Sequence, residues 1–207
     1  MFVAALIVAS VLALANWWSR WTDDGRLELI TKPLTTVAAI GVAFAADGPG
    51  NATAAAVAGL VLCLVGDIAL LPAVDKFVAG LGAFLFGHIA FIGMAGYLGL
   101  RSWTLAGIAM VASALLAALY GVQILRGATL QKLQKPVALY LLVISTMTVF
   151  GWATRNWLMC VGSASFIASD TILGWRTFVA EKRWSPVAIM VTYHIAIISL
   201  AASLAIA

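Results

Sequence analysis

The chain contains 207 residues, of which 64% are hydrophobic and only 10% are charged, and its mean hydropathy is +1.07. A soluble domain carries about 25% charged residues, so this composition excludes a water-soluble globular protein. The formal net charge is +4, but the 12 Lys and Arg residues are scattered singly between apolar runs. That pattern is typical of loop charges on a membrane protein, and we expect no nucleic-acid partner.

Apolar segments alternate with short polar breaks along the whole sequence. A membrane-crossing helix needs about 20 apolar residues, so the chain has room for about eight such helices with short connections. The predicted helices cover residues 2–17, 33–46, 52–71, 77–98, 102–124, 136–153, 156–175 and 186–205. The sequence therefore predicts an all-α polytopic membrane protein with eight transmembrane helices, forming one transmembrane domain over residues 1–207.

The distribution of Lys and Arg among the predicted loops is lopsided. The loops on one side of the bundle hold ten of these residues, and the loops on the other side hold only Arg101 and Arg155. Because cytoplasmic loops carry the excess of Lys and Arg, the sequence predicts both termini outside. We expect an integral protein of the plasma (inner) membrane, surrounded by membrane lipid. The sequence does not indicate an oligomeric state.

An internal duplication divides the chain into repeat 1, about residues 1–100, and repeat 2, about residues 101–207. The matched pairs are Lys32 and Lys135, Asp67 and Asp170, both at an offset of 103, and His88 and His194 at an offset of 106. Each half has four predicted helices, an even number, so both halves enter the membrane in the same direction. The sequence predicts two parallel four-helix repeats that place matched residues at matched depth.

Asp67 and Asp170 lie inside apolar runs, each near the cytoplasmic end of its predicted helix. A charge facing lipid costs several kcal/mol, so such residues face the bundle interior or a wet cavity. Two buried carboxyl groups that face each other can divide into a proton donor and an ionised partner, which predicts an acid/base pair. The alternative is a structural role, with each carboxylate paired to Lys32 or Lys135.

Five further residues are candidates for contacts with a substrate: Lys32, Lys135, His88, His194 and Tyr193. The two lysines each precede a proline that is expected to start a helix, where a lipid phosphate would lie, or they serve only as positive-inside anchors. The histidines either handle protons or are packing residues, and their predicted depth disfavours a direct bond to the aspartates. The depth mismatch also weakens a site with His and Asp ligands, and we expect no metal and no cofactor.

The chain resembles the YhhN-type lysoplasmalogenase family of integral membrane proteins. The resemblance rests on Lys32-Pro33-Leu34, Gly66-Asp67, the Gly80–His88 stretch, Ser169-Asp170 and Tyr193, which run over nearly the full chain. It implies cofactor-independent hydrolysis of the vinyl ether bond of a lysophospholipid substrate, lysoplasmenylethanolamine or lysoplasmenylcholine. The products would be a fatty aldehyde and a glycerophospho-base.

Vinyl ether hydrolysis needs an acid that protonates the alkene carbon and an anion that stabilises the resulting oxocarbenium ion. Asp67 and Asp170 are the expected catalytic pair, although near-symmetric halves do not indicate which one donates the proton. The alternative function is a proton-coupled small-molecule transporter, because parallel repeats with buried polar residues also describe carriers. A non-catalytic scaffold would gain nothing from matched buried carboxylates.

Overall fold

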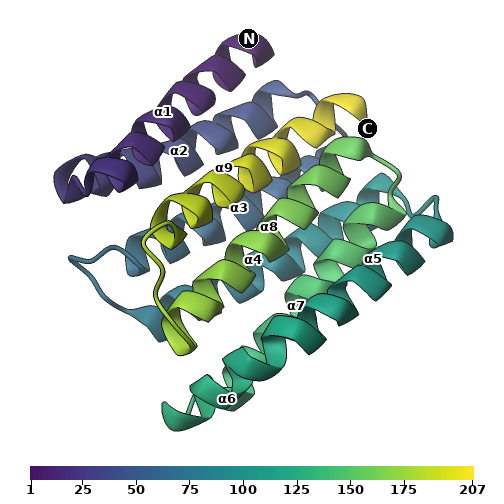
Figure 1. Cartoon of the computed structure of the whole chain (residues 1–207). Coiled ribbons are helices and arrows are strands. Elements are labelled where there is room, and N and C mark those ends of the chain that lie inside the picture. The colour runs from purple at the N-terminus through teal and green to yellow at the C-terminus, as the bar shows by residue number, and fades with distance from the viewer.

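The computed structural model describes residues 1–207 and contains only helices and loops (Figure 1). The helices are α1 (Phe2–Thr22), α2 (Gly25–Ala45), α3 (Gly50–Ala69), α4 (Phe77–Leu98), α5 (Trp103–Leu116), a π-helix (Ala117–Gly121), α6 (Val122–Leu130), α7 (Gln134–Ala153), α8 (Trp157–Phe178), α9 (Ser185–Ala202) and a 3₁₀-helix (Ser203–Ile206). Eight helical spans are long and apolar enough to cross a membrane, with α5, the π-helix and α6 forming one span. The predicted all-α fold with eight spans is confirmed.

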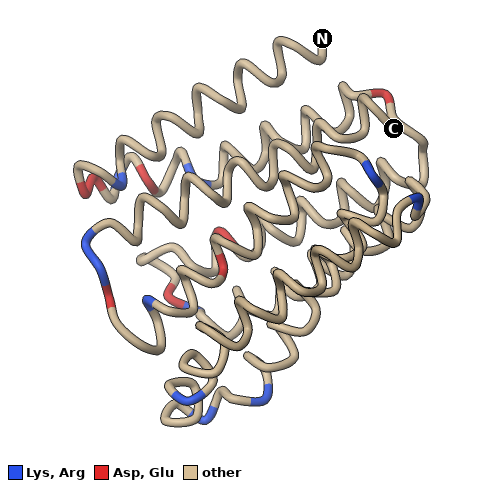
Figure 2. The backbone as a smooth tube through the Cα atoms, turned by 45° about the vertical axis from the view of Figure 1, so that its right-hand side comes forward, with Lys and Arg blue, Asp and Glu red and all other residues tan.

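The surface of the bundle is apolar along its length and charged at its ends. Large side chains such as Trp18, Leu119 and Leu142 are more than 60% exposed, which is the pattern of a lipid-facing surface and not of a surface in water. Figure 2 shows most Lys, Arg, Asp and Glu residues near the ends of the helices. Ten of the twelve Lys and Arg residues lie toward one end, which we call the cation-rich end.

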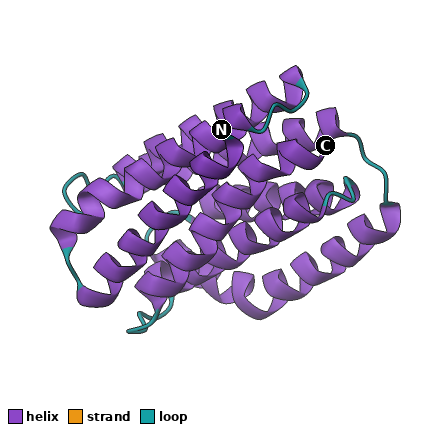
Figure 3. Cartoon of the chain, turned by 90° about the horizontal axis from the view of Figure 1, so that it is seen from above, coloured by secondary structure: helices purple, strands orange, loops and turns teal.

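The helices run roughly along a common axis, as the view from above shows (Figure 3). Helices α3 and α4 pack side by side, as do α8 and α9, while α1 and α2 lie at one edge and α5 and α6 at the other (Figure 1). Small residues permit the close approach of α3 and α4. A Cβ atom at Gly59 would lie 2.7 Å from the Phe91 ring, and one at Gly66 would lie 2.5 Å from the Phe84 ring.

Helix α2 begins eight residues before the predicted start at residue 33. Asp24 caps it by accepting hydrogen bonds from the backbone N–H groups of Arg26 and Leu27, at 3.0 and 3.1 Å. The prediction that Pro33 starts a helix was wrong, because Pro33 lies inside α2. Lys32 is consequently placed in the third turn and is only 5% exposed.

Two other spans are longer than predicted at the cation-rich end. Helix α8 ends at Phe178 and not at residue 175, because Arg176 is accommodated within the helix and pairs with Glu181. Asp170 therefore lies eight residues before the helix end, about 12 Å deep at 1.5 Å per residue. The span that was expected to end at residue 124 continues through α6 to Leu130.

The packing of the two halves is alike in part. The fourth span of each half packs on the second span of the other half: α9 packs on α2, and α4 packs on α7. A parallel duplication predicts this pair of equivalent contacts. The first spans differ, because α1 packs on α9 whereas α6 packs on α8. The duplication stays a prediction, and one hydrophobic core joins buried residues of both halves.

Candidate functional site

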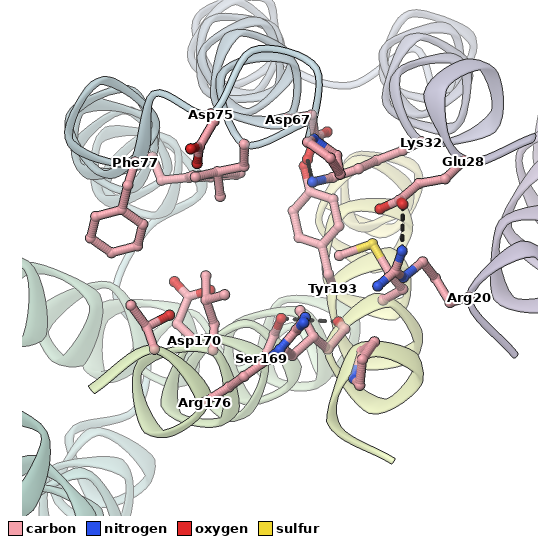
Figure 4. Close-up of a pocket in the computed structure, with 18 residues that line it drawn as sticks. Arg20, Glu28, Lys32, Asp67, Asp75, Phe77, Ser169, Asp170, Arg176 and Tyr193 are labelled. Atoms are coloured by element: carbon pink, nitrogen blue, oxygen red, sulfur yellow. Dashed lines mark hydrogen bonds and ion pairs between the residues drawn. The ribbon is translucent and has the colours of Figure 1, made fainter. Parts of the chain in front are cut away.

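A cavity of about 540 Å³ lies at the cation-rich end between α1, α2, α3, α4, α8 and α9 (Figure 4). Asp67 and Asp170 lie on different walls of this cavity, as the close-up shows. Its other charged lining residues are Arg20, Glu28, Lys32, Asp75 and Arg176. The structure therefore brings the two predicted carboxyl groups to one polar cavity at the cation-rich end.

The two carboxylate oxygens of Asp67 have different partners. Its Oδ2 accepts hydrogen bonds from Thr36 Oγ1 at 2.5 Å and from Tyr193 Oη at 2.7 Å. Its Oδ1 has no hydrogen-bond partner and lies 3.9 Å from Lys32 Nζ. An ammonium group this close stabilises a carboxylate, and both charges are almost completely buried.

Asp170 has different partners. Its Oδ2 accepts a hydrogen bond from Tyr140 Oη and lies 3.3 Å from His88 Nε2, which is itself 2.9 Å from Tyr140 Oη. No Lys or Arg pairs with Asp170. We assign the ring proton of His88 to Nε2, because Nδ1 is buried without any partner and an N–H there would be unsatisfied.

The His88–Asp170 contact overturns the expectation that depth separates the histidines from the aspartates. The expected depths assumed that α8 ends at residue 175, and the extra turn places Asp170 nearer to His88. Both side chains also gain a common neighbour in Tyr140, which projects from α7 between them. The three residues come from α4, α7 and α8, so their meeting depends on tertiary packing.

The mouth of the cavity holds charges of both signs. Arg20 of α1 donates a hydrogen bond to Glu28 of α2, and both side chains are largely buried. Arg176 pairs with Glu181 in a more exposed position. Asp75 lies in the α3–α4 loop and has no ion-pair partner in the structure. The mouth thus holds two guanidinium groups that are paired with carboxylates of the protein and one carboxylate, Asp75, without an ion-pair partner.

The structure separates the predicted substrate-contact residues into two groups. Lys32 and Tyr193 line the cavity, and His88 lies behind Asp170. Lys135 is exposed at the second residue of α7 and is not part of the cavity lining. His194 is fully buried outside the lining, where its Nδ1 accepts a hydrogen bond from Trp17 Nε1 at 3.0 Å.

Sequence reasoning did not single out several residues that the structure places at the site. Thr36 carried a usable signal, because it lies one helical turn after Lys32 and so shares its face. Asp75 and Arg176 carried no such signal, since each reaches the site only through the packing of its helix or loop. No three His, Cys, Asp or Glu side chains are grouped so as to hold a metal ion.

Comparison with known proteins gives one match. The sequence model of the YhhN family matches residues 27–204, which is most of the chain. No curated protein and no solved structure matches the chain. The matched residues include α2 from Leu27 onward and all of α3 to α9, and with them Asp67 and Asp170.

Proposed function

The chain belongs to the YhhN family, and on that premise we propose that it is a membrane-embedded hydrolase that cleaves the vinyl ether bond of lysoplasmalogens. The products are a fatty aldehyde and a glycerophospho-base. The observation that carries the proposal is the pair of carboxyl groups that face one cavity with unlike partners, Asp67 beside a lysine and Asp170 beside a tyrosine and a histidine. An acid and an anion are what this hydrolysis requires.

Asp170 is the proposed proton donor. Both of its neighbours, Tyr140 and His88, contact Oδ2, so Oδ1 has no hydrogen bond from the protein. The side chain of Asp170 is 10% exposed. With no cation beside it, the carboxyl group can hold a proton on Oδ1. When that proton leaves, hydrogen bonds from Tyr140 and His88 stabilise the new carboxylate.

Asp67 is the proposed anion. Lys32 lies on its Oδ1 side, while Thr36 and Tyr193 donate to Oδ2, so the arrangement suits a carboxylate that remains ionised. A carboxylate in a cavity of low dielectric constant stabilises a nearby oxocarbenium ion, and it can also accept a proton from the attacking water.

The reaction then balances in three steps. Asp170 transfers its proton to the alkene carbon that is β to the ether oxygen, and an oxocarbenium ion forms. Water adds to the adjacent carbon while Asp67 accepts one of its protons, which gives a hemiacetal. The hemiacetal loses its hydroxyl proton to the Asp170 carboxylate, and Asp67 returns its proton to the leaving glycerol oxygen as the C–O bond breaks.

The polar mouth fits the head group of the same substrate. Lys32, Arg20 and Arg176 can approach a phosphate, and the unpaired Asp75 carboxylate can approach the ammonium group of the base. We place this mouth on the cytoplasmic side of the plasma membrane with both termini outside, because the cation-rich end of a membrane protein faces the cytoplasm.

The test is release of fatty aldehyde from lysoplasmenylethanolamine by the purified protein in detergent. We expect activity in the wild type and its loss in both Asp67→Asn and Asp170→Asn. The matched control is Asp47→Asn, because Asp47 is exposed in the loop at the opposite end, with a φ of 54° that asparagine also tolerates. Full activity of either cavity variant in folded protein would contradict the mechanism.

A proton-coupled transporter is the second candidate, and the buried contact between His88 and Asp170 favours it, since such pairs relay protons in carriers. The two functions give opposite results. A carrier would move substrate into proteoliposomes in response to a pH gradient and release no aldehyde. The proposed hydrolase releases aldehyde in detergent, where no gradient exists.

A further inference from the structure

A second cavity adjoins the polar one and has the opposite character. It lies between α4, α6, α7 and α8, and ten of its twelve lining residues are hydrophobic. Asp67 lines the polar cavity alone, whereas five residues line both cavities: Leu70, Phe77, Phe84, Asp170 and Leu173. Asp170 thus lies where a polar space meets an apolar one.

A third cavity continues the second. It shares Ile124 and Leu141 with the apolar cavity and extends along the π-helix Ala117–Gly121, and five of its nine lining residues are hydrophobic. A π-helix widens the backbone spiral locally and is frequent at functional sites. The three cavities therefore follow one another in space, from the polar mouth, past Asp170, to the π-helix.

Along α7 and α8, the lining of the second and third cavities runs away from the cation-rich end. Along α8 the lining passes from Gly174 to Ile167, and along α7 it passes from Val137 to Ser145. Seven or eight residues correspond to about 10–12 Å at 1.5 Å per residue. The polar cavity itself reaches Ser169 on α8, so the third cavity, at Ile167 and along the π-helix, is the part that lies farthest from the cation-rich end.

We infer that this apolar passage holds the hydrocarbon chain of a single-chain lipid whose head group occupies the polar cavity. The identity of the lipid rests on the proposed function, but the passage rests on its own geometry. A single-chain phospholipid has a charged head and one apolar tail in the same order as the cavities. A vinyl ether, which joins the tail to the glycerol, would then lie beside Asp170.

The passage is narrow without its occupant. The free volume is about 40 Å³ in the second cavity and about 20 Å³ in the third, so a chain must displace side chains to enter. The edge-to-face pair of Phe77 and Phe178, with ring centroids 5.7 Å apart, lies at the near end of the passage. Rotation of these rings and of Leu141 would open a path for one chain.

Leu141 offers the sharpest test, because it lies at the junction of the second and third cavities. Leu141→Trp fills the junction, and Leu141→Ala enlarges it. The matched control is Leu142→Trp, since Leu142 is the adjacent residue of α7 and is 63% exposed to lipid. The probe is a 1-acyl lysophosphatidylethanolamine with a diazirine near the end of its chain, which the vinyl ether reaction cannot consume.

Photolabelling reports the position of the chain directly. We expect label on residues of the π-helix and on Ile124 in the wild type and in Leu142→Trp, stronger label in Leu141→Ala, and a loss of about tenfold in Leu141→Trp. Label confined to lipid-exposed residues, or label at the π-helix that Leu141→Trp does not reduce, would overturn the inference.

Aldehyde release with alkenyl chains of different length gives an independent reading. In Leu141→Trp we expect aldehyde release to fall about tenfold for chains long enough to reach from Asp170 past the junction at residue 141. Shorter chains should show little change. An equal loss at every length would overturn the inference. The proposed function fails separately, if the wild type releases no aldehyde at any length, and the photolabelling would still decide where the chain lies.

Discussion

Asp67 and Asp170 are matched in the sequence but differ in their surroundings. Asp67 is fully buried, with a lysine 3.9 Å away and two hydroxyl donors. Asp170 has a tyrosine and a histidine, no lysine, and an apolar passage on one side. Two identical side chains at positions matched by a common offset thus have unlike neighbours, and the proposed function assigns them unlike roles, one as the acid and one as the anion.

The difference originates partly in the lengths of two helices. Lys32 is the eighth residue of α2, because Asp24 caps that helix well before the lysine, whereas Lys135 is the second residue of α7. Six residues of helix amount to about 9 Å, so one lysine is carried inward and the other stays at the surface. The different starting points of α2 and α7 therefore give the two lysines different surroundings.

The largest expected effect comes from exchanging the two carboxyl groups for amides. Asp170→Asn should lower aldehyde release by about 10³-fold, because general acid catalysis contributes about 10²–10⁴-fold. Asp67→Asn should lower it by about 10²-fold, because it removes one charge that stabilises the cation. Single-turnover rates of the purified variants check this order. If Asp67→Asn were the more damaging change, the assignment of acid and anion would have to be reversed.

The two lysines should differ next. Lys32→Met removes the only cation beside Asp67, and breaking a buried pair in this way destabilises proteins by about 3–5 kcal/mol. We expect a large fall in thermal stability and in activity. Lys135→Met is the matched control, and an exposed change of this kind should alter stability by less than about 0.5 kcal/mol. Thermal unfolding in detergent measures both, and equal effects would show that the comparison between the lysines is mistaken.

A smaller difference should separate the two tyrosines. Tyr140→Phe and Tyr193→Phe each remove one hydrogen bond to a carboxyl group, which is worth about 1.5–3 kcal/mol when the acceptor is charged. Tyr140→Phe should mainly lower the rate of the chemical step, because its acceptor becomes charged during proton transfer. Tyr193→Phe should reduce stability as well, since Asp67 is already charged in the resting protein under the proposed mechanism. Rates at saturating substrate and unfolding curves would distinguish the two patterns.

The smallest effect is expected at the second histidine. His194→Gln preserves an acceptor for Trp17 Nε1 and should change stability by about 1 kcal/mol or less, with activity nearly unaltered. His88→Gln should lower activity by about tenfold, because it disturbs the donors on Asp170. Comparison of the two variants in the aldehyde assay tests whether only one histidine serves the site. A strong loss in His194→Gln would give both histidines a role in the reaction.

Composition and periodicity were sufficient to predict the eight spans. Charged residues are so rare in this chain that Asp67 and Asp170 could be selected directly, and the structure places both in one cavity. Helix ends were less predictable, because charges such as Lys32 and Arg176 were assumed to lie in loops. Their partners, Asp67 and Glu181, allow them to continue a helix instead.

The side-chain partners of the carboxyl groups could not be predicted. Tyr140, His88 and Asp170 come from three helices, and their meeting depends on the rotation and depth of each helix. A repeat offset relates positions within each half, but it does not say which helix of the other half lies opposite. The apolar passage is likewise a property of several helices together, and no local pattern signals it.

Helix α1 lies outside the residues that match the family, yet it supplies one wall of the cavity mouth. Arg20 is held there by Glu28, and Trp17 attaches the helix to α9 through His194. The two carboxyl groups of the proposed reaction belong to other helices. Under the proposed function, changes in α1 would alter which head groups are admitted while leaving the reaction chemistry intact, so that substrate preference could diverge independently of catalysis.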